Sequence, residues 1–214
     1  MTDRSKTKQK ILATSLGLFN NEGEGLISSV DIASVIGISP GNLYYHYKGK
    51  DEIIAALFDD FEEEIRMVLS APIKEPLQIE DNWVYLYIIF EEIYDFRFFY
   101  RNLSQILTRI PALAPRFSRI LSQKERMATA FLGPIEDSGI LIFEPGEKEA
   151  LAGRLAQHFT FWLQYHDLRH GTSAAAKSLI DQGVYNSLIQ IAPYANPEVG
   201  MKDLLRDFLA RQSK

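Results

Sequence analysis

The sequence predicts an all-α protein with a small N-terminal three-helix domain and a larger C-terminal helical domain. Apolar residues recur at helical spacing from the start, as in Ile11, Leu12, Leu16 and Phe19. No stretch shows two-residue alternation bounded by hairpin turns, which would indicate strands. The 214 residues are 46% hydrophobic and 24% charged, so the chain has enough apolar material for a sizeable core. We expect the domains to span residues 1–50 and 51–214.

The composition excludes several classes of protein. The chain contains no cysteine, which rules out a thiol nucleophile, an iron–sulfur cluster and a zinc finger. Its longest apolar run, 83–90, is far shorter than the roughly 20 residues of a membrane span. No apolar signal-peptide stretch follows the N-terminal basic residues. We therefore expect a cytoplasmic protein that does not contact a membrane and needs no cofactor.

Charge is distributed unevenly along the chain. The net charge is −5, yet residues 1–50 carry six Lys and Arg against four Asp and Glu. Residues 51–69 are strongly acidic, with one Arg against seven carboxylates. Because salt screens exposed charges beyond about 8–10 Å, a local basic face can bind phosphate on an acidic protein. We expect the acidic patch after Lys50 to face solvent.

The N-terminal part reads as short helices separated by glycine. The first helix is predicted to end at Gly23, and a short helix capped by serine follows to about Ile36. Gly37 breaks that helix, and Ser39-Pro40 provides a cap with proline at the first helical position of the next one. That second short helix runs to residue 47. A longer helix then spans 51–70, with two acidic residues in its first turn.

The C-terminal part has longer helices and more aromatic residues. Proline and glycine fall at or near the joints between the segments. Gly133-Pro134 lies inside one segment and is able to kink or split it. The helices predicted here span 78–94, 96–110, 114–137, 146–169, 174–191 and 197–212.

Residues 26–50 fit two short helices joined by a tight turn. Ile32, Ala33 and Ile36 form an inner face, and Leu43 packs the second helix back on the first. The residues left facing outward are small, polar or aromatic, which suits the major groove of DNA. Free N–H groups and hydroxyls at the start of the first helix are able to hold a phosphate. The candidate DNA-binding residues are Ser28, Ser29, Ser39, Gly41, Asn42, Tyr44, Tyr45, His46, Lys48 and Lys50.

This segment resembles the DNA-binding domain of the TetR/AcrR family of bacterial transcriptional regulators. The resemblance is carried by Leu43-Tyr44-Tyr45-His46-Tyr47 followed by Lys50, behind Ile32-Ala33 and Gly37-Ile38-Ser39. It covers about residues 8–58. Tyr47 takes a position usually held by phenylalanine. The stretch Phe96–Leu107 also looks similar to a C-terminal domain found in one branch of the family.

The resemblance implies a homodimer that binds a palindromic operator in double-stranded DNA and releases it when a small-molecule effector enters the larger domain. By the family pattern, Tyr44, His46 and Lys50 would contact phosphates. Gly41, Asn42 and Tyr45 would lie nearest the bases. A dimer places its two recognition helices about 34–36 Å apart, which is one turn of DNA.

Two other classes of function remain as alternatives. One is a helical protein-interaction module that does not bind DNA. The other is a serine hydrolase, because residues 37–41 match G-x-S-x-G and His46 lies nearby. That motif requires a strand before the serine and a helix after it, so Ser39 is better explained as a helix cap. His166 and His170 have a zinc-binding spacing, but their place near a helix end favours a structural role and we expect no metal site.

Two dense bands of aromatic residues, around 83–100 and 159–165, indicate an effector that is largely apolar or aromatic. Helical aromatic residues more often fill a core than line a pocket, so the two possibilities stay open. The candidate ligand-binding residues are Trp83, Tyr87, Phe90, Tyr94, Phe99, Arg101, Phe159 and Trp162.

The helices predicted over about 147–169 and 174–191 present apolar stripes. Together these stripes bury more surface than one monomer's core requires. As the family resemblance implies, we expect the two helices to pair with those of a second copy in a four-helix bundle. The alternative is that both helices lie inside one monomer.

Overall fold

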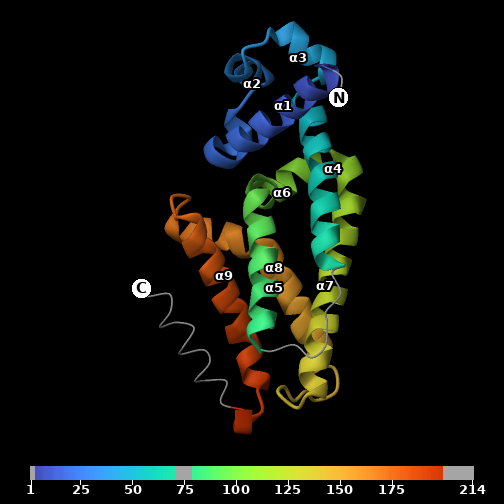
Figure 1. Cartoon of the computed structure of the whole chain (residues 1–214), viewed down its shortest axis with the longest axis vertical. Coiled ribbons are helices and arrows are strands. Elements are labelled where there is room, and N and C mark those ends of the chain that lie inside the picture. Colours follow the sequence, from blue (N-terminus) through green and yellow to red (C-terminus); the bar gives the residue numbers. More distant parts are fainter. Residues whose placement is uncertain (1–2, 71–78, 200–214) are drawn as a thin grey trace. The chain divides into compact units, whose positions relative to one another are not determined.

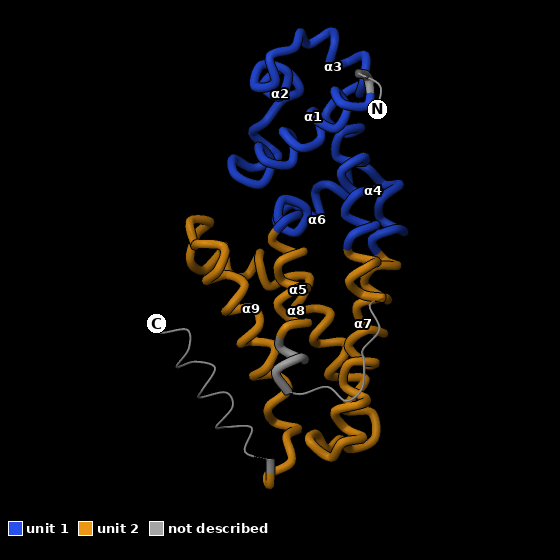
Figure 2. The backbone as a smooth tube through the Cα atoms, viewed as in Figure 1, with its two compact units in different colours: residues 1–64, 95–117 blue, residues 65–94, 118–214 orange. Residues whose placement is uncertain are grey.

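The computed structural model describes residues 3–70 and 79–199, and the elements in these ranges are helices joined by turns and loops (Figure 1). One isolated bridge joins Leu141 and Ala195. The all-α prediction is confirmed. The chain divides into two compact units (Figure 2). Unit 1 comprises residues 1–64 and 95–117, and unit 2 comprises 65–94 and 118–214. Among the described residues, no helix is long and apolar enough to cross a membrane.

Unit 1 holds the N-terminal helices and one later helix. It contains α1 (Asp3–Leu18), α2 (Ser29–Ile36), α3 (Pro40–His46), the first part of α4 (Lys50–Leu69), α6 (Arg97–Arg109) and the start of α7 (Ala114–Asp137). Its core is aromatic, and Phe61 contacts the rings of Phe58, Phe99 and Phe117. Residues 95–117 therefore fold with the N-terminal helices, although they lie 45 or more positions beyond residue 50.

The connection between α1 and α2 is less regular than predicted. The α-helix ends at Leu18 and continues as a π-helical turn, Phe19–Gly23, and a 3-10 turn, Glu24–Leu26. Gly23 ends the π turn with a positive φ of 94°, which is unfavourable for other residues. The π turn places Asn20, which is buried, against the start of α6. Its side chain donates to Asp95 O (2.7 Å) and accepts from the backbone N–H of Phe98 (3.1 Å).

Unit 2 consists of longer helices around a second core. It holds the end of α4, α5 (Ile79–Asp95), most of α7, α8 (Glu147–His170) and α9 (Ala176–Ile191). Phe90 of α5 is buried in this core, with its ring 5.6 Å from that of Phe159 and 5.7 Å from that of His158, both on α8. These helices agree with the predicted segments to within two residues.

Two details of the C-terminal helices differ from expectation. Pro134 does not split α7, which runs continuously to Asp137. A break occurs instead in α6, where Asn102 has non-helical backbone angles (φ −119°, ψ 21°). The helix predicted over 197–212 begins as a 3-10 turn, Pro197–Val199, and its remaining residues lie outside the described part of the chain.

Candidate nucleic-acid interface

Helix α2 begins with a capping box. Ser28 Oγ accepts a hydrogen bond from the backbone N–H of Asp31 (3.2 Å), and the Ser28 backbone N–H donates to Asp31 Oδ2 (2.8 Å). The Ser28 hydroxyl also donates to the same carboxylate oxygen (2.6 Å). These bonds from Ser28 hold the pKa of the Asp31 carboxyl below its usual value. The cap fixes the start of α2, the helix that packs against α3.

Gly37 makes the turn between α2 and α3. Its φ of 78° lies in the left-handed region, and its N–H closes the helix on Ala33 O (3.0 Å). Ala33 is completely buried, so its small side chain lets the two helices approach closely. The turn therefore forms as the sequence predicts, with a glycine where the backbone needs one.

Helix α3 is held by its cap and a single buried anchor. Ser39 Oγ accepts from the backbone N–H of Asn42 (3.1 Å), and Pro40 occupies the first helical turn. Leu43 is fully buried and Tyr47 nearly so. A helix, and not a strand, precedes Ser39, so the arrangement is not the strand–turn–helix of a hydrolase nucleophile elbow. The hydrolase alternative is therefore wrong for this motif.

The opposite face of α3 is open to solvent. Tyr45 is 61% exposed and Tyr44 44% exposed, which is unusual for large aromatic side chains. Ser39, Gly41, Asn42 and Lys48 are exposed with them. His46 is half-buried, and its ring lies 5.3 Å from that of Tyr45 in an edge-on arrangement. Most of the predicted DNA-binding residues are thus brought to one end of unit 1.

Two of the predicted DNA-binding residues, Ser29 and Lys50, have surroundings that the sequence did not indicate. Ser29 is only 8% exposed, so its hydroxyl does not join the open face of Ser28. Lys50 Nζ lies 2.9 Å from Glu24 Oε1 and donates to the main-chain oxygen of the same residue (2.9 Å). The Lys50 ammonium therefore has an intramolecular carboxylate partner.

Glu24 and Arg109 belong to this region but were not found from sequence. The Glu24 carboxylate is 1% exposed, and Arg109 of α6 also pairs with it, with Nη2 at 2.6 Å from Oε1. Arg109 Nε reaches Asp51 Oδ1 at 2.7 Å. Acid and base stand 85 positions apart, so no local pattern indicates the pairing. In the sequence, Glu24 is only an acidic residue between two glycines, and this pattern does not indicate a buried ion pair.

The basic residues of α1 also make internal contacts. Lys10 Nζ donates to Ile36 O at the end of α2 (3.1 Å), where a cation is favourable to the helix dipole. Lys8 lies over the ring of Tyr47, 5.3 Å from its centroid. These contacts fix α1 to the α2–α3 pair.

The acidic patch of α4 is mostly exposed, as expected. Asp59, Asp60, Glu63 and Glu64 are open to solvent, whereas Glu62 is half-buried. Arg116 at the start of α7 pairs with both Asp59 (2.8 Å) and Glu62. Partial burial, followed by neighbouring carboxylates, raises the pKa of Asp60 and of Glu64.

The candidate ligand-binding residues fall in both units. Phe99 and Arg101 belong to unit 1, where Phe99 is buried among aromatic rings and Arg101 donates to Asn20 O (3.2 Å). In unit 2, Phe90 and Phe159 are buried against each other. Tyr87 donates to Asp181 Oδ1 (2.8 Å), and Tyr94 is half-buried. The side chain of Trp83 lies outside the described residues.

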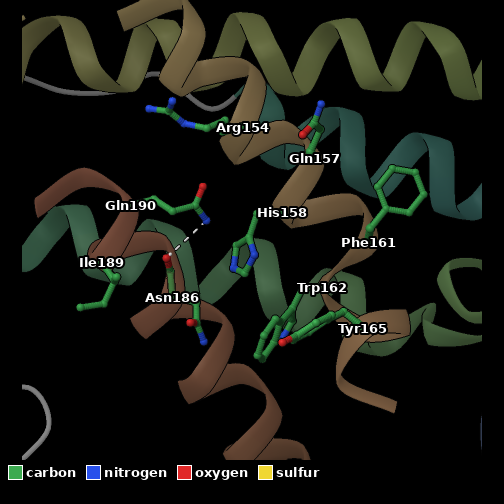
Figure 3. Close-up of a pocket in the computed structure, with 9 residues that line it drawn as sticks. All are labelled: Arg154, Gln157, His158, Phe161, Trp162, Tyr165, Asn186, Ile189 and Gln190. Carbon is green, nitrogen blue, oxygen red and sulfur yellow. Dashed lines mark hydrogen bonds between the residues drawn. The ribbon is translucent and has the colours of Figure 1, made fainter. Parts of the chain in front are cut away.

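A hollow of about 580 Å³ lies on unit 2 between α8 and α9 (Figure 3). Trp162 and His158 line it, and Trp162 is the one candidate ligand residue among its lining side chains. Phe161 and Ile189, which also line it, are 47% and 42% exposed. The hollow is therefore bordered by apolar surface that faces solvent.

Two models of protein families match this chain, one in its N-terminal part and one in its C-terminal part. A family model described as "Bacterial regulatory proteins, tetR family" matches residues 11–57. A second model, described as "Bacterial transcriptional repressor", matches residues 60–201. The two matches together cover most of the chain, including both compact units.

Individual relatives agree with these matches. A crystal structure of a TetR-family transcriptional regulator from Marinobacter aquaeolei VT8 is 29% identical, covers 97% of this chain and 99% of that one, and superposes with a TM-score of 0.83. GusR of Salmonella enterica shares the fold at 19% identity and a TM-score of 0.57, over 90% of this chain and 98% of its own. The HTH-type regulator AcrR of Shigella flexneri is 30% identical over 63 residues, and this match spans 29% of each chain.

Proposed function

The chain belongs to the TetR family of bacterial DNA-binding transcriptional regulators, which are not enzymes, and from this premise we propose that it is a ligand-responsive repressor. It binds a palindromic operator as a homodimer and leaves the DNA when a small effector binds. Residues 1–50 carry the DNA-binding function, and residues 51–214 carry effector binding and dimerisation.

The observation that carries the proposal is the open face of α3. Exposed Tyr44 and Tyr45 beside Asn42 are costly as a plain solvent surface, because large aromatic side chains gain free energy when they are covered. In a major groove the amide of Asn42 is able to read an adenine edge, and the tyrosine hydroxyls are able to bind phosphates. Ser28, at the N-terminus of α2, and Lys48, after α3, supply further phosphate contacts at the edges of this face.

The exposed surface of α8 and α9 supports dimerisation. Phe161, Tyr165 and Leu168 of α8 are exposed by 47%, 52% and 89%. Phe161 and Tyr165 line the same hollow as Ile189 of α9. A soluble monomer rarely exposes contiguous apolar patches of this kind without a partner. Pairing two copies through α8 and α9 would bury these side chains in a four-helix bundle. The partner's side chains would fill the hollow shown in Figure 3.

The effector is proposed to be largely apolar or aromatic and to bind within unit 2. Phe90 and Phe159 pack against each other there, and Tyr87, which precedes Phe90 by three positions on α5, donates to Asp181. An apolar surface with a few polar groups is the usual composition of a small-molecule site. The effector acts by its differential affinity for two conformations, and α4, which runs through both units, is the lever between them.

The rival function is a protein-interaction module whose α3 face binds a polypeptide. The two proposals are separated by fluorescence anisotropy with a duplex from the gene's own upstream region and a scrambled duplex as control, each at two salt concentrations. Repression predicts tight binding to the native duplex alone, with two chains per site. Absence of sequence preference by a folded, effector-free protein would favour the rival.

Two variants test the face directly. Asn42→Ala should change the preference among operator sequences, because Asn42 is proposed to lie nearest the bases. Tyr44→Ala should weaken binding to all duplexes about equally, because a phosphate contact carries no sequence information. Val35→Ala, at an exposed position on α2 outside the proposed DNA face, is the matched control and should leave both properties unchanged.

A further inference from the structure

The strongest feature outside the proposed DNA face is the ion-pair cluster of Glu24, Lys50, Asp51 and Arg109, which lies wholly in unit 1. Glu24 comes from the turn before α2, Lys50 and Asp51 begin α4, and Arg109 ends α6. Both Lys50 Nζ (2.9 Å) and Arg109 Nη2 (2.6 Å) approach the same carboxylate oxygen, Glu24 Oε1. Three segments far apart in the sequence therefore meet at one buried acid.

Arg109 also lines the same surface hollow as the basic residues next to α3. This hollow, of about 620 Å³, is formed by Lys48, Gly49, Lys50, Asp51, Glu52 and Arg109. Together with Glu24, the site holds three cations and three carboxylates. Without Arg109, the remaining two cations, Lys48 and Lys50, would face three carboxylates, and the site would have a net negative charge.

We propose that Arg109 is a positioning residue for DNA binding: it neutralises Glu24 and Asp51 and so leaves the Lys50 ammonium available to a DNA phosphate. This inference rests on the proposed DNA-binding function of the α3 face and on the phosphate contact that the family resemblance implies for Lys50. It extends the DNA-binding machinery to α6, well beyond residues 11–57 that match the N-terminal family model.

The physical argument starts from the burial of Glu24. A carboxylate with 1% exposure requires compensating charge, because little water reaches it. When Arg109 is present, Arg109 and Lys50 together balance the negative charge of Glu24. The Lys50 ammonium, which is 23% exposed, is then only partly neutralised and is able to attract a phosphate. Without Arg109, Lys50 becomes the main partner of Glu24. Asp51, which is 51% exposed, loses its cation and repels the DNA backbone.

The chain offers a matched control in Arg116. This arginine also bridges two carboxylates of α4, Asp59 (2.8 Å) and Glu62. Asp59 lies nine residues after Lys50, which is about 13 Å along a helix and beyond the Debye length of roughly 10 Å at 0.1 M salt. Arg109→Met and Arg116→Met therefore change the net charge equally, but only the first acts next to Lys50.

The test is operator affinity, measured by fluorescence anisotropy between 50 and 200 mM salt, with thermal unfolding to verify that each variant is folded. Arg109→Met should weaken binding by about fivefold to tenfold at 0.1 M salt, and should reduce the slope of log affinity against log salt by about one. Arg116→Met should stay within about twofold of wild type and keep the slope. Equal effects of the two variants would overturn the proposal.

A second pair of variants gives a gain of binding, which a folding defect cannot produce. Glu24→Gln keeps the shape of the side chain and removes the charge that holds Lys50, so it should tighten operator binding severalfold. In the double variant Glu24→Gln with Arg109→Met, most of the affinity lost in Arg109→Met should return. Glu62→Gln, with the same change in charge, should have little effect.

The outcomes separate this inference from the proposed function. A wild-type protein with no preference for the native duplex would contradict the proposed function itself. Specific binding by wild type, combined with no recovery in the double variant or no difference between Glu24→Gln and Glu62→Gln, would overturn the role of Arg109 alone.

Discussion

The ring of Phe90 occupies the space that a side chain at Gly183 would need. A Cβ atom built on Gly183 would lie 2.5 Å from Phe90 Cε1, closer than packed carbon atoms come. Phe90 is 2% exposed and held by Phe159 and His158, and His158 Nε2 is 3.0 Å from the Gly183 carbonyl oxygen. Helices α5, α8 and α9 thus meet at a position where one residue has to be glycine.

Gly183→Ala should therefore destabilise the protein by about 1–3 kcal/mol, because the ring or the helix has to move. The measurement is denaturant unfolding followed by circular dichroism. Gly153→Ala on α8 is the control, since nothing lies within 4 Å of its added carbon, and it should be neutral or stabilising. Equal stability of the Gly183 variant and wild type would contradict this description of the α5–α9 contact.

Asn20→Asp tests the junction between the π turn and α6. The aspartate can still accept the Phe98 N–H, but when ionised it has no proton to donate to Asp95 O, and its charge is buried. The variant should lose about 2 kcal/mol or more at neutral pH. Burial raises the pKa of such a carboxyl, so the loss should shrink as the pH falls towards about 4, where protonation restores the donor. Asn21→Asp, at an exposed site where Arg97 supplies a donor, should be neutral or slightly favourable.

Lys124 introduces a pH dependence of stability. Its side chain is fully buried in unit 2, with Nζ 3.2 Å from Thr160 Oγ1, and burial lowers the pKa of Lys124 to about 7. Between about pH 7 and 10.5 the unfolded chain binds a proton that the folded chain does not, so wild-type stability rises with pH in this window. Below pH 7 the full cost of burying the charge is present.

Lys124→Met removes this proton linkage. The variant should gain stability relative to wild type at pH 6, and the gain should diminish by an amount on the order of 4 kcal/mol by pH 10. Unfolding curves of both proteins across this range measure the difference, which cancels the titration of other groups. A difference that does not change with pH would show that Lys124 has an ordinary pKa.

The dimer surface is tested by placing a charge at its centre. Phe161→Glu and Leu168→Glu should convert a dimer to a monomer, because an unpaired carboxylate would be buried between the two copies. Sedimentation velocity measures the change. Val35→Glu on α2 of unit 1, also at an exposed apolar position, should leave the dimer intact. A wild-type protein that sediments as a monomer would contradict the proposed assembly.

Much of the helix-turn-helix was predictable because its signals are local. Gly37 adopts the left-handed conformation that the turn needs, and Ser39 caps α3 through a bond to the residue three positions on. The helical spacing of apolar residues likewise predicts that Leu43 is buried and Tyr45 is exposed, as the structure shows. Each of these outcomes depends on neighbours within one or two helical turns.

The features that the sequence did not indicate share one cause, which is contact between distant segments. Ser29 follows a good cap, yet its side chain is covered by the fold. Lys50 reads as a free cation, yet it pairs with a carboxylate 26 positions earlier. The aromatic band around 83–100 looks like one group of residues, but Phe90 and Phe99 belong to different compact units. The periodicity of apolar residues predicts which face of a helix is buried, but not which segment packs against that face.

Local sequence patterns predict the all-α class, the approximate bounds of nearly every described helix and the residues exposed on α3, since backbone conformation and capping depend on residues close in the chain. The tertiary structure decided that α6 folds with the N-terminal helices, that Asn20 fastens its first turn and that Arg109 and Lys50 share one buried carboxylate. Those features need segments more than 25 positions apart to meet. Their energy comes from burial and charge pairing, which exist only once the chain has packed.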